Sequence, residues 1–190
     1  MRPAPEGCDG ADWEQVTPSL QSALCKAISE RSWPIAMFGD VGCGKSMAAA
    51  SLFCKWQGFA LWWPAGMLMA LIAEGRGNGK GFVEITVEGR PVEMWHRAMI
   101  RDIAECDLLV IDDIGIRPPT PAQSQALFDV LQARKGKPFI ITANKGPGTR
   151  NKPGLEEILE DRHVSRLSAG QWLEVTGDDR RLVRQIRRVG

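Results

Sequence analysis

Short apolar runs alternate with longer segments of mixed character along most of the chain. Each run is a few residues long and nearly free of polar side chains, which is typical of a strand covered on both faces of a sheet. Five such runs lie at 34–38, 59–63, 107–111, 139–142 and 171–175. Strands that alternate with helical segments form parallel sheets. The pattern therefore predicts an α/β protein with a central, mainly parallel five-stranded sheet.

Helices are predicted where apolar residues recur every three or four positions. The start of one is marked by Thr120, Pro121 and Gln123, which form a capping box with proline at the first helical position. The predicted helices span 13–32, 47–56, 65–74, 91–104, 121–134, 155–167 and 178–190.

The region between 75 and 104 departs from the simple alternation. Glycine occupies every second position of 75–81, which predicts a flexible loop carrying Arg76 and Lys80. Residues 82–87 alternate like a strand and end in a turn. Pro91 is predicted to open a helix, and the apolar face of that helix consists of Val92, Trp95, Met99 and Ile103. Residues 1–12 are rich in Pro, Gly and acidic residues and are predicted to be mobile.

A phosphate-binding loop lies between the first strand and the helix that follows it. Gly39–Ser46 fits G-x-x-x-x-G-K-[ST] at every position. Its glycines let backbone N–H groups surround a phosphate chain, and the helix adds the positive end of its dipole. Lys45 is expected to reach the β- and γ-phosphates, and the Ser46 hydroxyl to bind Mg²⁺. The predicted nucleotide-binding residues are Gly39, Asp40, Val41, Gly42, Cys43, Gly44, Lys45, Ser46 and Met47.

Polar side chains follow two later strands. Asp112 and Asp113 stand where a buried strand emerges, and Asn144 follows the next one. Beside a phosphate loop, Asp112 would hold Mg²⁺ with Ser46, and Asp113 would orient or deprotonate the attacking water. The carboxamide of Asn144 can hydrogen-bond the γ-phosphate or that water. An acidic turn and a turn-forming Asn are the alternatives for these two features.

Composition narrows the setting of the protein. The chain has 190 residues, enough for one domain with a core, and a formal net charge of +1. Any binding to nucleic acid must therefore come from local patches. The five cysteines are odd in number and lack CxxC spacing, which indicates reduced thiols in a cytoplasmic protein. The sequence shows no signal segment and no apolar run long enough to span a membrane.

Four motifs in order resemble the AAA+ ATPases of the DnaC/IstB type, which are bacterial and phage helicase loaders and transposition helper ATPases. They are Gly39–Ser46, Leu-Val-Ile-Asp-Asp-Ile-Gly at 109–115, Ile-Thr-Ala-Asn at 141–144 and Asp-Arg-His-Val-Ser-Arg-Leu at 161–167. The resemblance implies a P-loop NTPase fold of the ASCE type, a three-layer sandwich without a helical lid. It covers about 33–177, with an N-terminal extension at 1–32 containing one helix and a basic C-terminal tail at 178–190.

The resemblance also implies particular roles. Lys45 and Ser46 would be Walker A residues, Asp112 and Asp113 Walker B, and Asn144 sensor 1. Arg166 falls where the family places an arginine finger, which completes the site of a neighbouring subunit. Arg162 is the alternative finger, and a surface arginine on a helix is the alternative role for either. The implied cofactors are ATP and Mg²⁺, and the implied assembly is a homo-oligomeric ring or filament with shared active sites.

The implied function is helicase loading in DNA replication, on single-stranded DNA and with a replicative helicase as partner, in the cytoplasm of a bacterium or a phage-infected host. A transposition helper ATPase with a transposase partner is the first alternative. A small phosphotransferase and a nucleotide-gated binding module are alternatives of other classes. Only about thirty residues precede the first strand, too few for the helicase-binding domain that loaders of this family carry.

Three basic patches are candidates for non-specific contact with single-stranded DNA, and an ordinary solvated surface is the alternative for each. They are Arg76 with Lys80, Arg97 with Arg101, and a tail containing Arg180, Arg181, Arg184, Arg187 and Arg188.

Overall fold

The computed structural model describes residues 2–87, 89–148 and 153–177. Its central sheet has five strands, and all neighbouring strands pair in parallel. The strand order is β2-β5-β6-β1-β7. The strands are β1 (Ile35–Phe38), β2 (Ala60–Pro64), β5 (Leu108–Ile114), β6 (Phe139–Ala143) and β7 (Gln171–Glu174). The predicted α/β architecture is confirmed.

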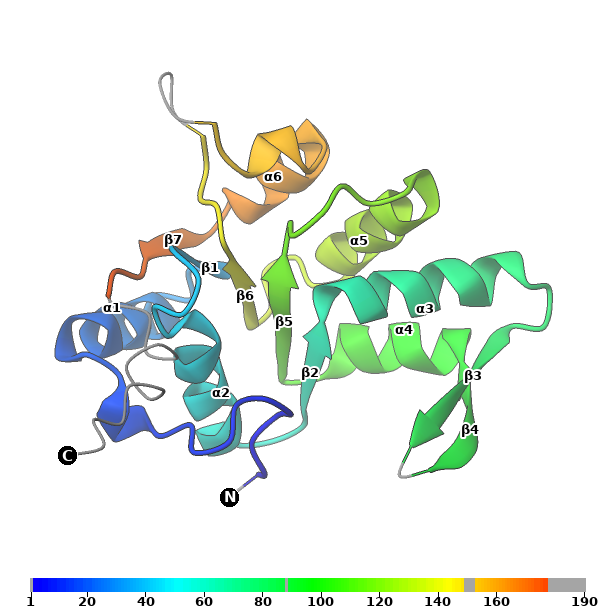
Figure 1. Ribbon diagram of the computed structural model, residues 1–190, viewed down its shortest axis with the longest axis horizontal. Coiled ribbons are helices and arrows are strands. Elements are labelled where there is room, and N and C mark those ends of the chain that lie inside the picture. Colours follow the sequence, from blue (N-terminus) through cyan, green and yellow to red (C-terminus); the bar gives the residue numbers. More distant parts are fainter. Residues whose placement is uncertain (1, 88, 149–152, 178–190) are drawn as a thin grey trace, which may run out of the picture.

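Helices cover both faces of this sheet (Figure 1). On one face lie α1 (Pro18–Ser29) and α2 (Lys45–Lys55). On the other lie α3 (Ala65–Gly77), α4 (His96–Glu105), α5 (Pro121–Ala133) and α6 (Asp161–Leu167). Single turns of 3₁₀ helix, η1 (Trp13–Gln15) and η2 (Leu155–Glu157), precede α1 and α6. No helix in the described part of the chain is long and apolar enough to cross a membrane.

Side chains of the central strands alternate between two hydrophobic cores. In β5, Leu109 and Ile111 pack under α3 and α5, whereas Leu108 and Val110 pack under α2. All four are at most 1% exposed. Because successive strand residues point to opposite faces, a strand covered on both sides needs an unbroken apolar run. This requirement explains the composition of the run from which the strand was predicted.

The expected helix at 91–104 is wrong in its first half. Residues Arg90–Trp95 form β4, which pairs antiparallel with β3 (Phe82–Val87), and α4 begins only at His96. The hairpin projects away from the five-stranded sheet (Figure 1). Val92 and Trp95 are 43% and 53% exposed, so they do not share a buried face with Met99 and Ile103. Their helical spacing was coincidental, and pairing with β3 decided the conformation.

Other predicted boundaries also shift. The helix expected at 13–32 begins at Pro18, because proline favours the first helical turn, and the helix expected at 155–167 is divided into η2 and α6. Helix α3 continues to Gly77, which places Arg76 on a helix rather than in a flexible loop. Arg76 forms an ion pair there with Asp129 of α5. The capping box of Thr120 and Gln123 is confirmed.

The segment that precedes η1 packs against the domain, in contrast to the predicted mobility. The guanidinium of Arg2 donates hydrogen bonds to the carbonyl oxygens of Phe53, at 3.0 Å, and Gly58, at 2.5 Å. It also lies over the Phe53 ring. A cation at the C-terminal end of α2 is favoured by the exposed carbonyls and the helix dipole. Cys8 is buried, at 4% exposure.

One buried charge joins α4, α5 and β6. The guanidinium of Arg134, which is 1% exposed, donates to the carbonyl oxygens of Ile103, Cys106 and Pro138. The first two belong to the end of α4, where carbonyls lack intrahelical partners. Arg134 therefore caps α4 from the neighbouring helix.

Replacing Arg134 by Met should lower the free energy of unfolding by about 3 kcal/mol, because several buried carbonyls lose their donor. Urea denaturation followed by circular dichroism measures this change. Lys137→Met is the matched control, since Lys137 also donates to a carbonyl of α4 but is exposed. It should cost less than about 0.5 kcal/mol. Equal effects of the two variants would show that burial of Arg134 has no special role.

Candidate nucleotide-binding site

The loop between β1 and α2 has the backbone that its glycines predict. Gly39, Gly42 and Gly44 have φ angles of 150°, 81° and 102°. A Cβ on Gly39 would lie 2.1 Å from the carbonyl oxygen of Val175, so only glycine fits against the segment after β7. Gly44 is the N-cap of α2, and Lys45 is the first residue of that helix. The loop is therefore a tight turn that ends at a helix N-terminus.

Lys45 points into the loop rather than toward solvent, and it is 4% exposed. Its ammonium group donates to the carbonyl oxygens of Gly39, at 2.9 Å, and Asp40, at 2.8 Å. The Cys43 sulfur lies 3.8 Å away. A buried ammonium needs such acceptors, because burying an unpaired charge is costly. The lysine is thereby held beneath the turn, where a phosphate chain would lie above it.

The acidic pair stands at the end of β5, next to the end of β6. The Thr142 hydroxyl donates to Oδ1 of Asp112 and accepts a 2.8 Å hydrogen bond from the backbone N–H of Asp113. Asp113 has a φ of 60°, in the left-handed region. Among the described residues, Arg31 is the only other non-glycine residue with a positive φ. Thr142 was not predicted as a site residue, although it belongs to the Ile-Thr-Ala-Asn motif at 141–144.

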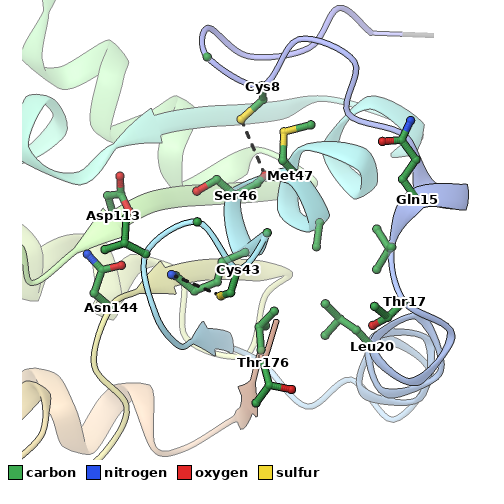
Figure 2. A pocket seen from close by; sticks show the side chains of 18 of the residues that line it. Cys8, Gln15, Thr17, Leu20, Cys43, Ser46, Met47, Asp113, Asn144 and Thr176 are labelled. Atoms are coloured by element: carbon green, nitrogen blue, oxygen red, sulfur yellow. Dashed lines mark hydrogen bonds between the residues drawn. The ribbon is translucent and has the colours of Figure 1, made fainter. Parts of the chain in front are cut away.

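A cavity of about 420 Å³ brings most of the predicted residues together, but Asp112 is not among the residues that line it. The phosphate loop lines it from Val41 onward, and Asp113 and Asn144 line the same cavity. In Figure 2, Asp113 and Asn144 lie on one side of the loop, and Thr17 and Leu20 lie on the opposite side. Gly39 and Asp40 are not part of the lining, because their carbonyls face Lys45 beneath the turn.

The N-terminal segment supplies a wall of this cavity that sequence analysis missed. The lining residues from this segment are Gly7, Cys8, Asp9, Asp12, Gln15, Val16, Thr17 and Leu20, and Val175 and Thr176 lie nearby. The Cys8 thiol contacts the Ser46 carbonyl oxygen at 3.8 Å. No local pattern marks these residues, since the packing of the segment against α2 brings them to the site.

Ser46 and Asp112 provide adjacent oxygen ligands of the kind that Mg²⁺ prefers. Burial raises the pKa of the Asp112 carboxyl above its ordinary value, and hydrogen bonds from Thr142 and Ser46 oppose this effect. The Ser46 hydroxyl lies near enough to the Asp112 carboxyl to lower its pKa. A cation there would stabilise the ionised carboxylate. The donor set therefore fits the metal that the motifs imply.

The two candidate finger arginines lie outside the described lining of the cavity. The guanidinium carbons of Arg162 and Arg166 lie 4.9 and 4.4 Å from the ring centre of Phe128 on α5. Arg162 also bonds to Glu160, whereas Nε of Arg166 has no hydrogen-bond partner in the part of the chain that the structure describes. His163 of α6 contacts α5, because its Nε2 lies 2.9 Å from the carbonyl oxygen of Ser124. Burial lowers the pKa of His163.

The basic patches are only partly supported. Arg76 is paired with Asp129, and Arg101 contacts Asp102, whereas Lys80 and Arg97 are exposed. The arginine-rich tail at 178–190 lies outside the described residues.

Comparison with known proteins places the fold. No protein-family model and no curated protein matches the sequence. A solved DnaC helicase loader has a TM-score of 0.66 at 16% identity, covering 90% of this chain and 100% of that one. A solved DNA replication initiation factor has a TM-score of 0.67 at 16% identity, covering 93% of this chain and 53% of that one. The replication initiator DnaA bound to AMPPCP and single-stranded DNA has a TM-score of 0.62 at 18% identity, covering 85% of this chain and 46% of that one. The chain spans about half the length of the last two.

The strand order and the geometry of the loop between β1 and α2 define a P-loop α/β fold. This fold is similar to that of the solved DnaC helicase loader, as the order of the motifs predicts.

Asp112→Asn should stabilise the protein in the absence of nucleotide. When folding raises the pKa of a carboxyl, the folded protein becomes less stable as pH rises, because the unfolded state releases that proton at lower pH. The gain should therefore be small near the ordinary pKa of an aspartate, about 4, and should grow as the pH rises above it. Thermal unfolding of both proteins across that range measures it. A wild type more stable than the variant near pH 8 would contradict this account.

Proposed function

We propose that this protein binds and hydrolyses MgATP and acts in DNA replication as a DnaC-like helicase loader. The observation that carries the proposal is the single cavity in which the phosphate loop faces Asp113 and Asn144. A phosphate-binding turn alone fits any nucleotide-binding protein. A carboxylate and a carboxamide opposite it are what hydrolysis of a terminal phosphate requires.

Phosphate binding follows from the loop and Lys45. Backbone N–H groups at the start of α2, with the helix dipole, favour an anion above the turn. On nucleotide binding, the Lys45 ammonium would exchange the carbonyl oxygens of Gly39 and Asp40 for phosphate oxygens. This exchange keeps the charge paired throughout. Ser46 and Asp112 would hold Mg²⁺, which neutralises charge on the β- and γ-phosphates.

Water activation is assigned to Asp113. Its side chain lines the cavity opposite the loop and beside Asn144 (Figure 2). Asp113 would orient the attacking water and accept its proton, while Asn144 would hydrogen-bond that water or the γ-phosphate. The nucleobase would enter the part of the cavity lined by Val16, Leu20 and Val175, whose apolar side chains suit a flat aromatic ring.

A neighbouring copy would complete the site. Arg166 lies on Phe128 and outside the described lining of its own cavity, which favours action on the site of another subunit in a ring or filament. The Phe128 ring supports the guanidinium of Arg166 from one face, and a guanidinium is a donor group that suits a phosphate.

The proposed partners are single-stranded DNA and a replicative helicase, and the proposed location is the cytoplasm. Support comes from the likeness in fold to a DnaC helicase loader and to DnaA bound to single-stranded DNA. Lys80 and Arg97, both exposed near the β3–β4 hairpin, are available for contacts with DNA phosphates.

Asp113→Asn should lower kcat for ATP by at least about a hundredfold, because a general base contributes that much, and should leave ATP binding intact. Lys45→Ala should lose binding itself. Phosphate release, measured against protein concentration with and without single-stranded DNA, checks the rates, and a fluorescent ATP analogue checks binding. Wild-type activity should rise with concentration and with DNA.

A phosphate-release rate that changes with neither protein concentration nor single-stranded DNA would instead favour a phosphotransferase. Turnover of the Asp113→Asn protein at the wild-type rate would exclude the assigned base.

Arg166→Ala should bind ATP but hydrolyse it on the order of a thousandfold more slowly, as loss of an arginine finger does. Mixing it with Lys45→Ala should restore measurable activity, because the second protein supplies Arg166 to the intact phosphate loop of the first. Arg162→Ala is the matched comparison, since Arg162 lies on the same ring. If Arg162→Ala shows the loss and the recovery instead, Arg162 is the finger.

A further inference from the structure

Between two paired positions, β5, which carries the two carboxylates, has one residue more than β6. Ile111 pairs with Ile141 and Ile114 with Ala143, with a register shift between them. Two residues of β5, Asp112 and Asp113, therefore face one residue of β6. That residue is Thr142. The arrangement is a β-bulge, which removes backbone groups from the ladder and redirects side chains.

Thr142 repairs the ladder at this point with its side chain. The hydroxyl oxygen accepts the backbone N–H of Asp113 at 2.8 Å, and its proton is donated to Oδ1 of Asp112. Thr142 is 0% exposed, so water does not compete for these bonds. One buried hydroxyl thus contacts both residues of the acidic pair, using its donor and acceptor capacity together.

The conformation of Asp113 needs such support. A φ of 60° is uncommon for any residue other than glycine, and it persists only where the surroundings hold it. Gly115, two residues later, also has a positive φ of 75°. The chain therefore turns sharply at the end of β5, and the turn directs Asp113 into the nucleotide cavity.

We propose that Thr142 is a positioning residue that sets the direction of both carboxylates. Its hydroxyl turns Asp112 toward Ser46 and holds Asp113 in the left-handed conformation that faces the nucleotide. The inference rests on the proposed function of this site. Thr142 is outside the described lining of the cavity, so it acts through its neighbours. It also joins the acidic pair to the strand that ends at Asn144.

Two variants separate the hydroxyl from the rest of the side chain. Thr142→Val keeps the shape and removes the hydroxyl, and Thr142→Ser keeps the hydroxyl. The first readout uses the protein without nucleotide, as hydrogen exchange of the Asp113 amide measured by NMR. Exchange should be about tenfold faster in Thr142→Val, the equivalent of one net hydrogen bond, and should return toward the wild-type rate in Thr142→Ser. The amide of Val110, in the regular ladder, is the internal control.

The second readout is turnover. Thr142→Val should lower kcat for ATP by about ten- to a hundredfold, because a misplaced base loses part of its contribution, while KM changes much less. Thr142→Ser should recover most of kcat. A merely structural role for Thr142 would not produce this difference between kcat and KM together with rescue by serine.

The outcomes are distinguishable. If the Asp113 amide of Thr142→Val exchanges at the wild-type rate, the Thr142 hydroxyl does not hold that amide, and the proposal fails. If the amide exchanges faster but kcat is unchanged, Thr142 has no positioning role. If the wild type hydrolyses no ATP, the proposed function fails, while the exchange rates still decide whether Thr142 holds Asp113.

Discussion

The parallel pairing of β5, β6 and β1 is the constraint on which the candidate nucleotide site depends. Parallel strands all end at the same edge of the sheet, so the segments that follow them meet there. The phosphate loop follows β1, the acidic pair ends β5, and Asn144 follows β6. Three pieces of chain far apart in sequence thus line one cavity. Parallel strands also require long crossovers, and the helices in these crossovers cover both faces of the sheet.

The site collects features that are unfavourable individually. Lys45 is an almost buried charge, Asp112 is a carboxylate whose pKa burial raises, and Asp113 has an uncommon backbone conformation. Each is offset by specific hydrogen bonds: Lys45 donates to the loop carbonyls, the Thr142 hydroxyl donates to Asp112, and the backbone N–H of Asp113 donates to that hydroxyl. Strand β6 is buried throughout, and β1 and β5 are mostly buried, so these paired strands hold the groups in place. Strained, polar features of this kind are typical of functional sites.

Predictions from the sequence were correct where the interactions are local and failed where residues far apart in the chain meet. The phosphate loop and the capping box at Thr120 depend on contacts within a few residues, and both were predicted. The segment 90–95 was predicted as helix because its apolar spacing fits one, but pairing with β3 made it a strand. The contact between Cys8 and Ser46 spans 38 residues and leaves no local pattern. The N-terminal wall of the cavity was therefore missed.

By itself, the sequence determined the fold class, the phosphate loop, and the expectation that Asp113 and Asn144 lie near it. Periodicity, glycine spacing and the order of motifs are patterns that the amino-acid sequence alone contains. Only the tertiary structure decided the β3–β4 hairpin, the N-terminal wall, the placement of Arg166 on Phe128 and the contacts of Thr142 with the acidic pair. These features depend on which surfaces meet after the sheet forms. The Thr142 hydroxyl contacts both acidic residues only because a bulge in the adjacent strand brings the Asp112 carboxylate and the Asp113 backbone N–H to it.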